Sequence, residues 1–303
     1  MRVVVDGVSK RYGRNLALDS ISFEVHHGLI GLLGQNGAGK STLLKILATV
    51  MPPTQGTIHY DGRTWPGSGQ AIRQRLGYLP QIFGLDDEAT GREFLRYAAA
   101  MKGIGPSHEI RLVADELLAE VGLSEAANMR LGHYSGGMRQ RIALAQSLIG
   151  MPELLILDEP TAGLDPEERT QLKALLSLRA RTATVLVSTH IVSDLDSLAN
   201  TILVMAGGQV LAVGTPAEIA AAAAGLVYEA ILTESIWTRV SARWTTRGFR
   251  ADGVAATIRA EGDAIYLRVV ADRAPAIPGA SVHATAPTLE DGYLALTAGI
   301  KNR

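Results

Sequence analysis

A glycine-rich segment, GQNGAGKST at residues 34–42, has the composition and spacing of a phosphate-binding loop. It lies between an apolar run typical of a buried strand and a run typical of a helix. Lys40 is expected to reach the β- and γ-phosphates of a nucleotide, and the Ser41 hydroxyl is expected to bind Mg²⁺. Three glycines allow the tight backbone turn that directs N–H groups at phosphate oxygens: Gly34, Gly37 and Gly39. The alternative, an ordinary glycine turn, is made less plausible by the order strand, loop, helix.

Two adjacent carboxylates end a second apolar run, LLILDEP at residues 154–160. Asp158 is placed to complete an Mg²⁺ shell, and Glu159 is placed to polarise a water molecule for attack on the γ-phosphate. Taken alone, the segment would be read as a strand ending in a solvated turn. Beside a phosphate-binding loop, the catalytic interpretation is favoured.

A second glycine turn, YSGGM at residues 134–138, opens a predicted helix. The N-terminus of a helix presents free N–H groups and the positive end of its dipole, so it binds phosphate well. The chain therefore carries a second potential phosphate cradle far downstream of the first. One nucleotide does not need both cradles from the same chain.

The elements that position these residues predict an α/β fold. Buried strands at 154–158 and 184–190 flank a helix that begins near Pro166, and this order favours a mostly parallel sheet. The first strands, before the phosphate-binding loop, alternate with period two and indicate an antiparallel part. A GG turn at 207–208 joins the two strands of a hairpin.

The chain is predicted to have two domains. Residues 1–224 form the larger one, with a helical subdomain at about 82–150 in which Thr90 begins a capping box. Residues 225–303 form a small α+β domain that contains no recognisable chemical motif, and Thr288 caps its last helix.

Composition excludes several classes of protein. The 303 residues carry a net charge of −1 and no basic block, which argues against nucleic acid as a partner. The absence of cysteine excludes disulfides and thiolate metal sites. The N-terminal segment does not read as a signal peptide, and the longest uncharged run, 197–217, is broken by glycine and proline, so no membrane span is expected.

The motifs together resemble the nucleotide-binding subunit of an ATP-binding-cassette (ABC) transporter. The resemblance covers about residues 2–218 and rests on six segments in the family's order: GQNGAGKST, LPQ, YSGGM, LLILDEP, AGLDP and STH. It implies a phosphate-loop NTPase core with an antiparallel β part and an inserted helical subdomain, followed by the small C-terminal domain. It also implies an ATPase that uses ATP and Mg²⁺.

The family's roles transfer to matching positions. Tyr12 resembles the aromatic residue that stacks on adenine, although it could be an ordinary half-buried aromatic. Gln81 resembles the glutamine that touches Mg²⁺ and the attacking water, and His190 the histidine that contacts the γ-phosphate. Asp165 resembles the aspartate of the dimer interface. Further nucleotide-binding residues are Asn36, Ala38, Thr42, Ser135, Gly136 and Gly137.

The resemblance explains the second cradle, because two such subunits pack head to tail. The segment Ser135–Gly137 of one chain then closes over ATP held by Lys40 of the other. The implied partners are a membrane permease and a second ATP-binding subunit, either an identical chain or a homologous one. The implied location is the cytoplasmic face of the membrane, as a peripheral protein.

The second cradle departs from the commonest family signature, LSGGQ, because it has Tyr134 and Met138 at the two ends. SGGM, together with PTLEDGYLAL at 287–296, resembles a branch that serves exporters with a separate membrane subunit. Phe83 and Leu85 are expected to line an apolar groove for that subunit. The alternatives are a soluble ABC ATPase that acts on ribosomes or DNA, which would need two cassettes or a long coiled coil, and the ATP-binding subunit of an importer.

Overall fold

A computed structural model describes residues 1–245 and 255–300, and its centre is a six-stranded, mostly parallel sheet. The strands follow the order β10-β9-β3-β8-β7-β6, and only the β9–β10 pair is antiparallel. This arrangement confirms the predicted parallel sheet and the GG hairpin. The strands are β3 (Gly28–Gly34), β6 (Leu76–Leu79), β7 (Leu154–Asp158), β8 (Thr184–Thr189), β9 (Thr201–Ala206) and β10 (Gln209–Gly214).

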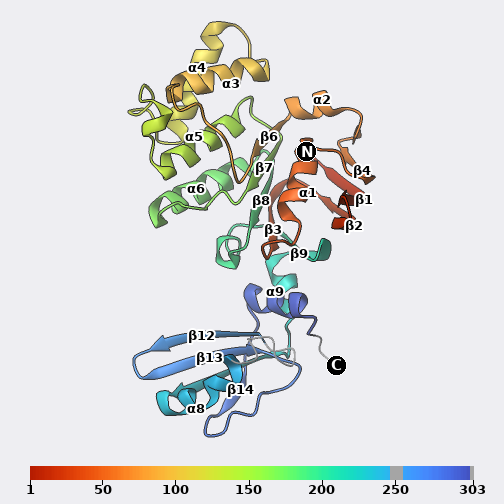
Figure 1. Cartoon of the computed structure of the whole chain (residues 1–303), viewed down its shortest axis with the longest axis vertical. Helices are drawn as coiled ribbons and strands as arrows, with labels where there is room; N and C mark the ends of the chain where they lie inside the picture. The colour runs from red at the N-terminus through yellow and green to blue at the C-terminus, as the bar shows by residue number, and fades with distance from the viewer. Residues whose placement is uncertain (246–254, 301–303) are drawn as a thin grey trace.

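An antiparallel sheet of order β2-β1-β4-β5 lies beside this central sheet (Figure 1). Its strands are β1 (Val3–Tyr12), β2 (Asn15–Val25), β4 (Gln55–Tyr60) and β5 (Arg63–Trp65). The β1–β2 hairpin places Tyr12 beside the phosphate-binding loop that follows β3. The predicted antiparallel part is therefore present.

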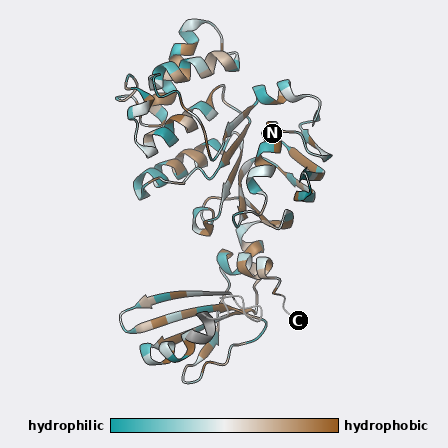
Figure 2. Ribbon diagram, in the orientation of Figure 1, coloured by the Kyte–Doolittle hydropathy of each residue, from teal (hydrophilic) through white to brown (hydrophobic). Residues whose placement is uncertain are grey.

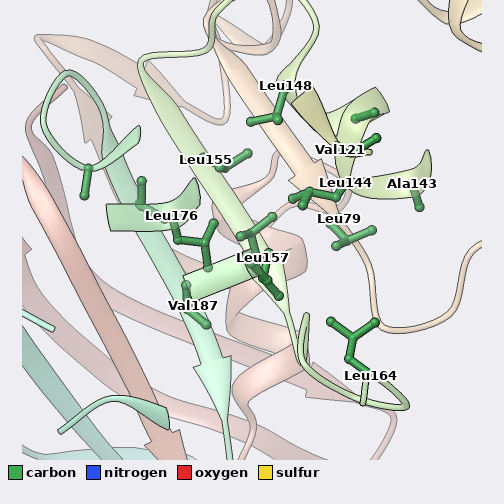
Figure 3. Packing of buried hydrophobic residues seen from close by; sticks show 14 of the residues in the cluster. Leu79, Val121, Ala143, Leu144, Leu148, Leu155, Leu157, Leu164, Leu176 and Val187 are labelled. Atoms are coloured by element: carbon green, nitrogen blue, oxygen red, sulfur yellow. The ribbon is translucent and has the colours of Figure 1, made fainter. Parts of the chain in front are cut away.

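Alternate residues of the central strands pack into two different cores. In β7, Leu155 and Leu157 belong to the core shared with the helices between residues 91 and 179, whereas Ile156 belongs to the core shared with the helix after the phosphate-binding loop. Figure 2 shows these strands as the most continuously hydrophobic part of the ribbon, and Figure 3 shows the first core from close by. Buried on both faces, the strands carry few polar residues, and these gather at the strand ends.

Helices cover both faces of the sheet. α1 (Lys40–Leu47) and α2 (Gly69–Gln74) lie on one side, and the longer helices lie on the other (Figure 1). The longer helices are α3 (Gly91–Lys102), α4 (Ser107–Glu120), α5 (Gly136–Leu148) and α6 (Pro166–Arg179). The capping box at Thr90 and the proline at the first turn of α6 are present as predicted. These local signals determine the residue at which each helix begins, and therefore the position of the loop that precedes it.

The C-terminal part contains an antiparallel sheet of order β12-β13-β11-β14 with one helix packed against it. Its elements are β11 (Val227–Thr233), α8 (Glu234–Thr245), β12 (Ala255–Glu261), β13 (Ala264–Val270) and β14 (Val282–Ala284). Before it comes the short helix α7 (Pro216–Ala221). The sheet and its helix agree with the small α+β part expected from the sequence.

The last helix, α9 (Leu289–Ala298), returns to the larger body and does not pack only on the tail. Its residues Leu289 and Tyr293 belong to the same core as Ile219 of α7 and Val204 of β9. The chain enters and leaves the C-terminal sheet at one place, because the Thr285 N–H donates to the Val227 carbonyl over 3.0 Å. The boundary near 224 stays a prediction, and α9 lies on the core side of it in space (Figure 1).

Among residues 1–245 and 255–300, no helix combines the length and the apolar composition that crossing a bilayer requires.

Candidate functional site

A polar cavity of about 580 Å³ lies where the phosphate-binding loop meets the β1–β2 hairpin, the loop after β6 and the β9–β10 turn. It gathers residues that are far apart in the sequence. The predicted site residues that line it are Tyr12, Asn36, Gly37, Gly39, Lys40, Ser41, Thr42, Gln81 and Glu159. A cavity at the carboxyl ends of parallel strands, beside a helix N-terminus, is suited to an anionic ligand.

Lys40 is the first residue of α1 and is buried at the floor of this site. Its ammonium donates to the Gly34 carbonyl over 2.7 Å and to the Gln35 carbonyl over 3.3 Å. Gly39, immediately before the helix, has φ of 99°, a left-handed conformation that glycine adopts without strain. Burial lowers the pKa of the Lys40 ammonium, although the Glu159 and Asp158 carboxylates oppose that shift.

The carboxylates at the end of β7 differ in their surroundings. Asp158 is buried, and its Oδ1 accepts from the Ser188 hydroxyl over 2.5 Å. The same hydroxyl accepts from the backbone N–H of Glu159 over 2.9 Å. Ser188 therefore fixes both positions of the DE pair, a role that sequence reasoning missed even though Ser188 belongs to the STH segment.

The Glu159 carboxylate lies between two basic side chains. Its Oε2 is 2.7 Å from Nδ1 of His190, and its Oε1 is 3.7 Å from Nζ of Lys40. The backbone of Glu159 has φ of 53°, which is uncommon for a residue with a side chain. Such strain at the end of a buried strand occurs most often at functional positions, because the surrounding structure must hold it in place.

The residues expected to bind Mg²⁺ offer oxygen atoms only. Ser41 and Gln81 line the cavity, and Asp158 lies behind it, close enough for its charge to act on Lys40. One hydroxyl, one amide and one carboxylate fit an ion that takes most of its ligands from phosphate and water. Within the residues that the structure describes, no group of three His, Cys, Asp or Glu residues forms a protein-only metal site.

Tyr12 stands at the mouth of the cavity with 46% of its surface exposed. Its hydroxyl contacts Sδ of Met51 at 3.1 Å, and Nζ of Lys10 lies 5.6 Å from the ring centroid. An exposed aromatic ring beside a phosphate-binding loop can stack on a planar base. The structure places Tyr12 where the stacking prediction requires it, and the role itself stays a prediction.

The β9–β10 turn also contributes to the cavity, which the sequence did not indicate beyond a hairpin. Gly207 and Gly208 line it together with Ala17 of β2. A Cβ atom on Gly208 would lie 2.7 Å from the Ala17 carbonyl oxygen, so a side chain there would collide with the backbone. The Gly208 N–H donates to the carbonyl of Ala38 over 3.1 Å, which ties the hairpin to the phosphate-binding loop.

The remaining predicted site residues lie elsewhere in the chain. Gly34 and Ala38 are buried behind the loop, where Gly34 serves as acceptor for Lys40. Ser135, the N-cap of α5, accepts from the Met138 N–H over 3.2 Å, and Gly136 and Gly137 follow it in the first turn. Asp165 caps α6. The second cradle is thus a separate helix N-terminus, and its residues do not line the cavity that contains Lys40.

The apolar groove expected at Phe83 and Leu85 stays a prediction. Both are half-buried and pack against the larger core, whereas Ile82 beside them is 88% exposed. On α3, Tyr97 and Met101 lie one turn apart and are 67% and 72% exposed. These three residues are the most exposed large apolar side chains of the helical segment, and Leu112 and Met129 are also exposed there.

Comparison with known proteins gives one family. A sequence profile described as "ABC transporter" matches residues 18–162. The Daunorubicin resistance ATP-binding protein DrrA3 of Streptomyces coeruleorubidus is 40% identical over 235 residues, which is 77% of this chain and 74% of that protein. A Nod factor export ATP-binding protein I of Burkholderia pseudomallei is 40% identical over 211 residues, 69% of each protein.

Solved structures similar to this chain indicate the same family. The ATP-binding subunit of an ABC transporter has a TM-score of 0.66 and 30% identity, covering 72% of this chain and 92% of its own. A dimeric ATP-binding cassette in a post-hydrolysis state, bound to ADP and phosphate, has a TM-score of 0.63 and 26% identity. It covers 70% of this chain and 98% of its own length.

Proposed function

The chain belongs to the ABC transporter family as one of its ATP-binding subunits, and from this premise we propose that it hydrolyses ATP to drive export through a separate membrane permease. Two relatives with 40% identity are named for drug resistance and for export, which favours an exporter over an importer. Attachment to the permease would hold the protein at the cytoplasmic face of the membrane. Ile82, Tyr97 and Met101 are the exposed apolar side chains that support such a contact.

The observation that carries the proposal is the position of Glu159 between Lys40 and His190 at the edge of the cavity. In the proposed reaction, a water oxygen attacks the γ-phosphorus while the bond to the bridging oxygen breaks. That oxygen leaves on ADP with the bonding electrons, and the proton lost by the water passes to the Glu159 carboxylate. His190 orients the carboxylate, and Lys40 stabilises charge on the β- and γ-phosphates.

Ser41, Gln81 and Asp158 would hold Mg²⁺. When bound, the ion would neutralise charge that develops on the phosphate oxygens. The Ser188 hydroxyl, which donates to Asp158, keeps one carboxylate oxygen of that residue oriented by protein and leaves the other for the metal shell.

We further propose that each ATP is shared between two chains. Ser135 and Asp165 lie outside the lining of the Lys40 cavity, where they are the N-caps of α5 and α6. A dimeric relative bound to ADP and phosphate supports a paired arrangement. The α5 N-terminus of one chain would then meet the γ-phosphate held by Lys40 of the other, where the helix dipole favours negative charge.

Mixing two inactive variants tests this shared site. Lys40→Ala removes the phosphate-binding cation, and Ser135→Arg fills the opposing cradle, so each homodimer has two damaged sites. A mixed dimer has one site with both lesions and one site with neither. ATPase activity, measured as phosphate release, should therefore reappear on mixing in proportion to the mixed dimers isolated by two different affinity tags.

The result that would overturn the shared site is a mixed dimer, verified by its tags, that stays as inactive as either parent. The proposal of an export ATPase has a separate test. Co-purification of the multi-span permease from detergent-solubilised membranes, together with its stimulation of ATP hydrolysis, is expected. An active chain that is isolated with ribosomes or DNA instead would contradict it.

A further inference from the structure

A charged contact joins helix α5, which begins at the second cradle, to helix α6, which begins at Asp165. Nη2 of Arg141 on α5 lies 3.3 Å from Oε1 of Glu168 on α6. The two side chains are 24% and 19% exposed, so water screens the contact only partly. Glu168 lies in the first turn of α6 and Arg141 in the second turn of α5, so the pair is close to the second cradle and to the segment that ends at Asp165.

The Glu168 carboxylate touches both of those loops. A Cβ atom on Gly137 would lie 2.3 Å from Oε1 of Glu168, so the carboxylate packs directly on the glycine backbone of the second cradle. Oε2 of Glu168 accepts from the Asp165 N–H over 3.3 Å, and the Glu168 N–H donates to Oδ1 of Asp165 over 2.8 Å. One carboxylate therefore contacts Gly137, Asp165 and Arg141 together.

The α5 side of this contact is fixed in turn by helix α4. Nη1 of Arg141 donates to the carbonyls of Val121 and Gly122 over 3.3 and 3.4 Å, where α4 ends. A cation is stabilised at that position because the carboxyl end of a helix is its negative pole. The neighbouring Gln140 donates from Nε2 to the carbonyl of Pro160 over 3.2 Å. Helix α5 thus contacts the start of the segment 160–165 directly, through Gln140, and its end through Glu168, which pairs with Arg141.

The apolar packing around the contact is incomplete. A cavity of about 270 Å³ lies among α4, α5, α6 and β6, and its apolar lining includes Leu79, Leu144 and Leu164, which Figure 3 labels. Side chains that face a cavity lack part of the close contact that fixes orientation in a dense core. The relative position of α5 and α6 must therefore depend more on their polar contacts at this point.

We propose that Arg141 and Glu168 are positioning residues that lock the segment 160–165 to the second cradle within one chain. Ser135 and Asp165 then approach the ATP held by the partner chain as one rigid unit. This inference rests on the proposed shared site. It assigns to Glu168 a role that neither the motif order nor the cavity lining of Lys40 indicates.

Kinetics of single and double variants test the lock. Glu168→Gln and Arg141→Gln each remove one charge, and each should lower kcat about fivefold, the effect of losing roughly 1 kcal/mol of a partly exposed ion pair. The KM for ATP should stay within about twofold, because Lys40 and its loop are not in contact with the pair. The double variant should be no slower than the slower single variant, since both changes break the same interaction.

Glu120→Gln is the matched control. Glu120 on α4 pairs with Arg179 on α6, borders the same cavity and is 31% exposed, yet it contacts neither the second cradle nor segment 160–165. Its kcat should match that of the unmodified chain, and its melting temperature should fall about as far as that of Glu168→Gln. A Glu168→Gln enzyme as fast as Glu120→Gln, or a double variant whose losses multiply, would overturn the lock.

The outcome can be separated from failure of the shared site. If mixing Lys40→Ala with Ser135→Arg restores activity while Glu168→Gln behaves as Glu120→Gln does, the lock fails and the shared site stands. If mixing restores nothing, the shared site fails. A lower kcat of Glu168→Gln with an unchanged KM would then show that the contact affects catalysis within one chain.

Discussion

Nδ1 of His190 lies 2.7 Å from Oε2 of Glu159, so the residues that follow two neighbouring parallel strands, β7 and β8, meet beside the cavity. The other carboxylate oxygen of Glu159 faces Lys40 at 3.7 Å. The carboxylate is thus oriented from two sides, as the proposed role of a base requires. A base whose orientation is fixed in this way needs little rearrangement during the reaction.

The first prediction concerns the Glu159→Gln variant. The amide keeps the size of the side chain but cannot accept a proton, so turnover should fall by about 10²-fold or more. ATP binding should persist, because Lys40 and the loop glycines are unchanged, and an ATP-bound dimer should accumulate in size-exclusion chromatography. Steady-state phosphate release near that of the unmodified chain would show that Glu159 is not the base.

The second prediction concerns Ser188, whose buried hydroxyl serves Asp158 and the Glu159 backbone at once. Ser188→Ala should reduce the free energy of unfolding by about 1–2 kcal/mol, as expected for a lost buried hydrogen bond. It should also lower kcat several-fold and raise the Mg²⁺ concentration needed for half-maximal activity. Titration of ATPase activity with Mg²⁺ measures both kcat and the Mg²⁺ requirement.

Ser147→Ala is the control for that variant. Ser147 is also buried, and its hydroxyl donates to the Leu144 carbonyl within α5 over 2.7 Å. It should lose comparable stability with an unchanged kcat and an unchanged Mg²⁺ requirement. Equal kinetics for the two variants would reduce Ser188 to a structural residue.

The sequence was sufficient for the residues whose role depends on local spacing. The loop at 34–42, the DE pair after β7, the capping box at Thr90 and the helix starts at YSGGM and near Pro166 are all where the sequence predicts them, because backbone geometry over a few residues determines them. The parallel sheet followed from the order of strands and helices. Local chemistry of this kind does not depend on which distant segments pack together.

Residues missed by sequence reasoning act through contacts between distant segments. Gly208 packs on Ala17, Ser188 orients Asp158, and Glu168 packs on Gly137. Nothing in the neighbourhood of each residue along the chain indicates its partner. Helix α9 is a similar case: its cap at Thr288 was predicted, but its packing on α7 depends on how the intervening sheet returns the chain.

A third prediction concerns the ion pair that anchors α9 to the C-terminal sheet. Asp291 is 2% exposed, and Nη2 of Arg268 on β13 donates to its Oδ2 over 2.6 Å. Burial would raise the pKa of Asp291, but hydrogen bonds from Arg268 and Thr288 outweigh it, so the pKa is lowered. A carboxyl group with a depressed pKa stabilises the fold above its unfolded pKa, near 3.9, and loses that contribution as pH falls through the lower folded value.

Asp291→Asn should therefore lower the free energy of unfolding by about 2 kcal/mol at pH 7, because Arg268 keeps its charge and retains only Glu229 as an acidic partner. The difference from the unmodified chain should shrink below about pH 4, where the natural carboxyl group also becomes neutral. Urea unfolding at several pH values measures it. Glu290→Gln, an exposed change on the same helix, should show no such pH dependence; a constant difference for Asp291→Asn would contradict the assignment.

The last prediction concerns the C-terminal sheet, which is inserted between α7 and α9, two helices that pack against each other. Tyr228 pairs with Ala284 across β11 and β14, and Thr285 hydrogen-bonds Val227, so the ends of the sheet are already adjacent. Replacing residues 229–283 by a short Gly-Ser linker should leave α9 on the core. Gly292 marks how close that packing is, since a Cβ atom there would lie 1.9 Å from the Ile219 carbonyl oxygen. The excised chain should bind and hydrolyse ATP with a kcat within about twofold of the full chain, because a short loop is closed at little entropic cost.

A chain that ends after Gly225 is the matched comparison, since it also lacks the sheet but loses α9. It exposes the core surface that Leu289 and Tyr293 cover, and each large apolar side chain contributes roughly 1.5–3 kcal/mol when buried. It should therefore melt at a lower temperature than the excised chain and aggregate more readily. If the two shortened chains had the same melting temperature and equal activity, α9 would contribute nothing to the stability of the core. The boundary near 224 would then mark the end of the core, despite the contacts of α9 with it. If both lost ATP binding while still folded, the sheet itself would contribute to the nucleotide site.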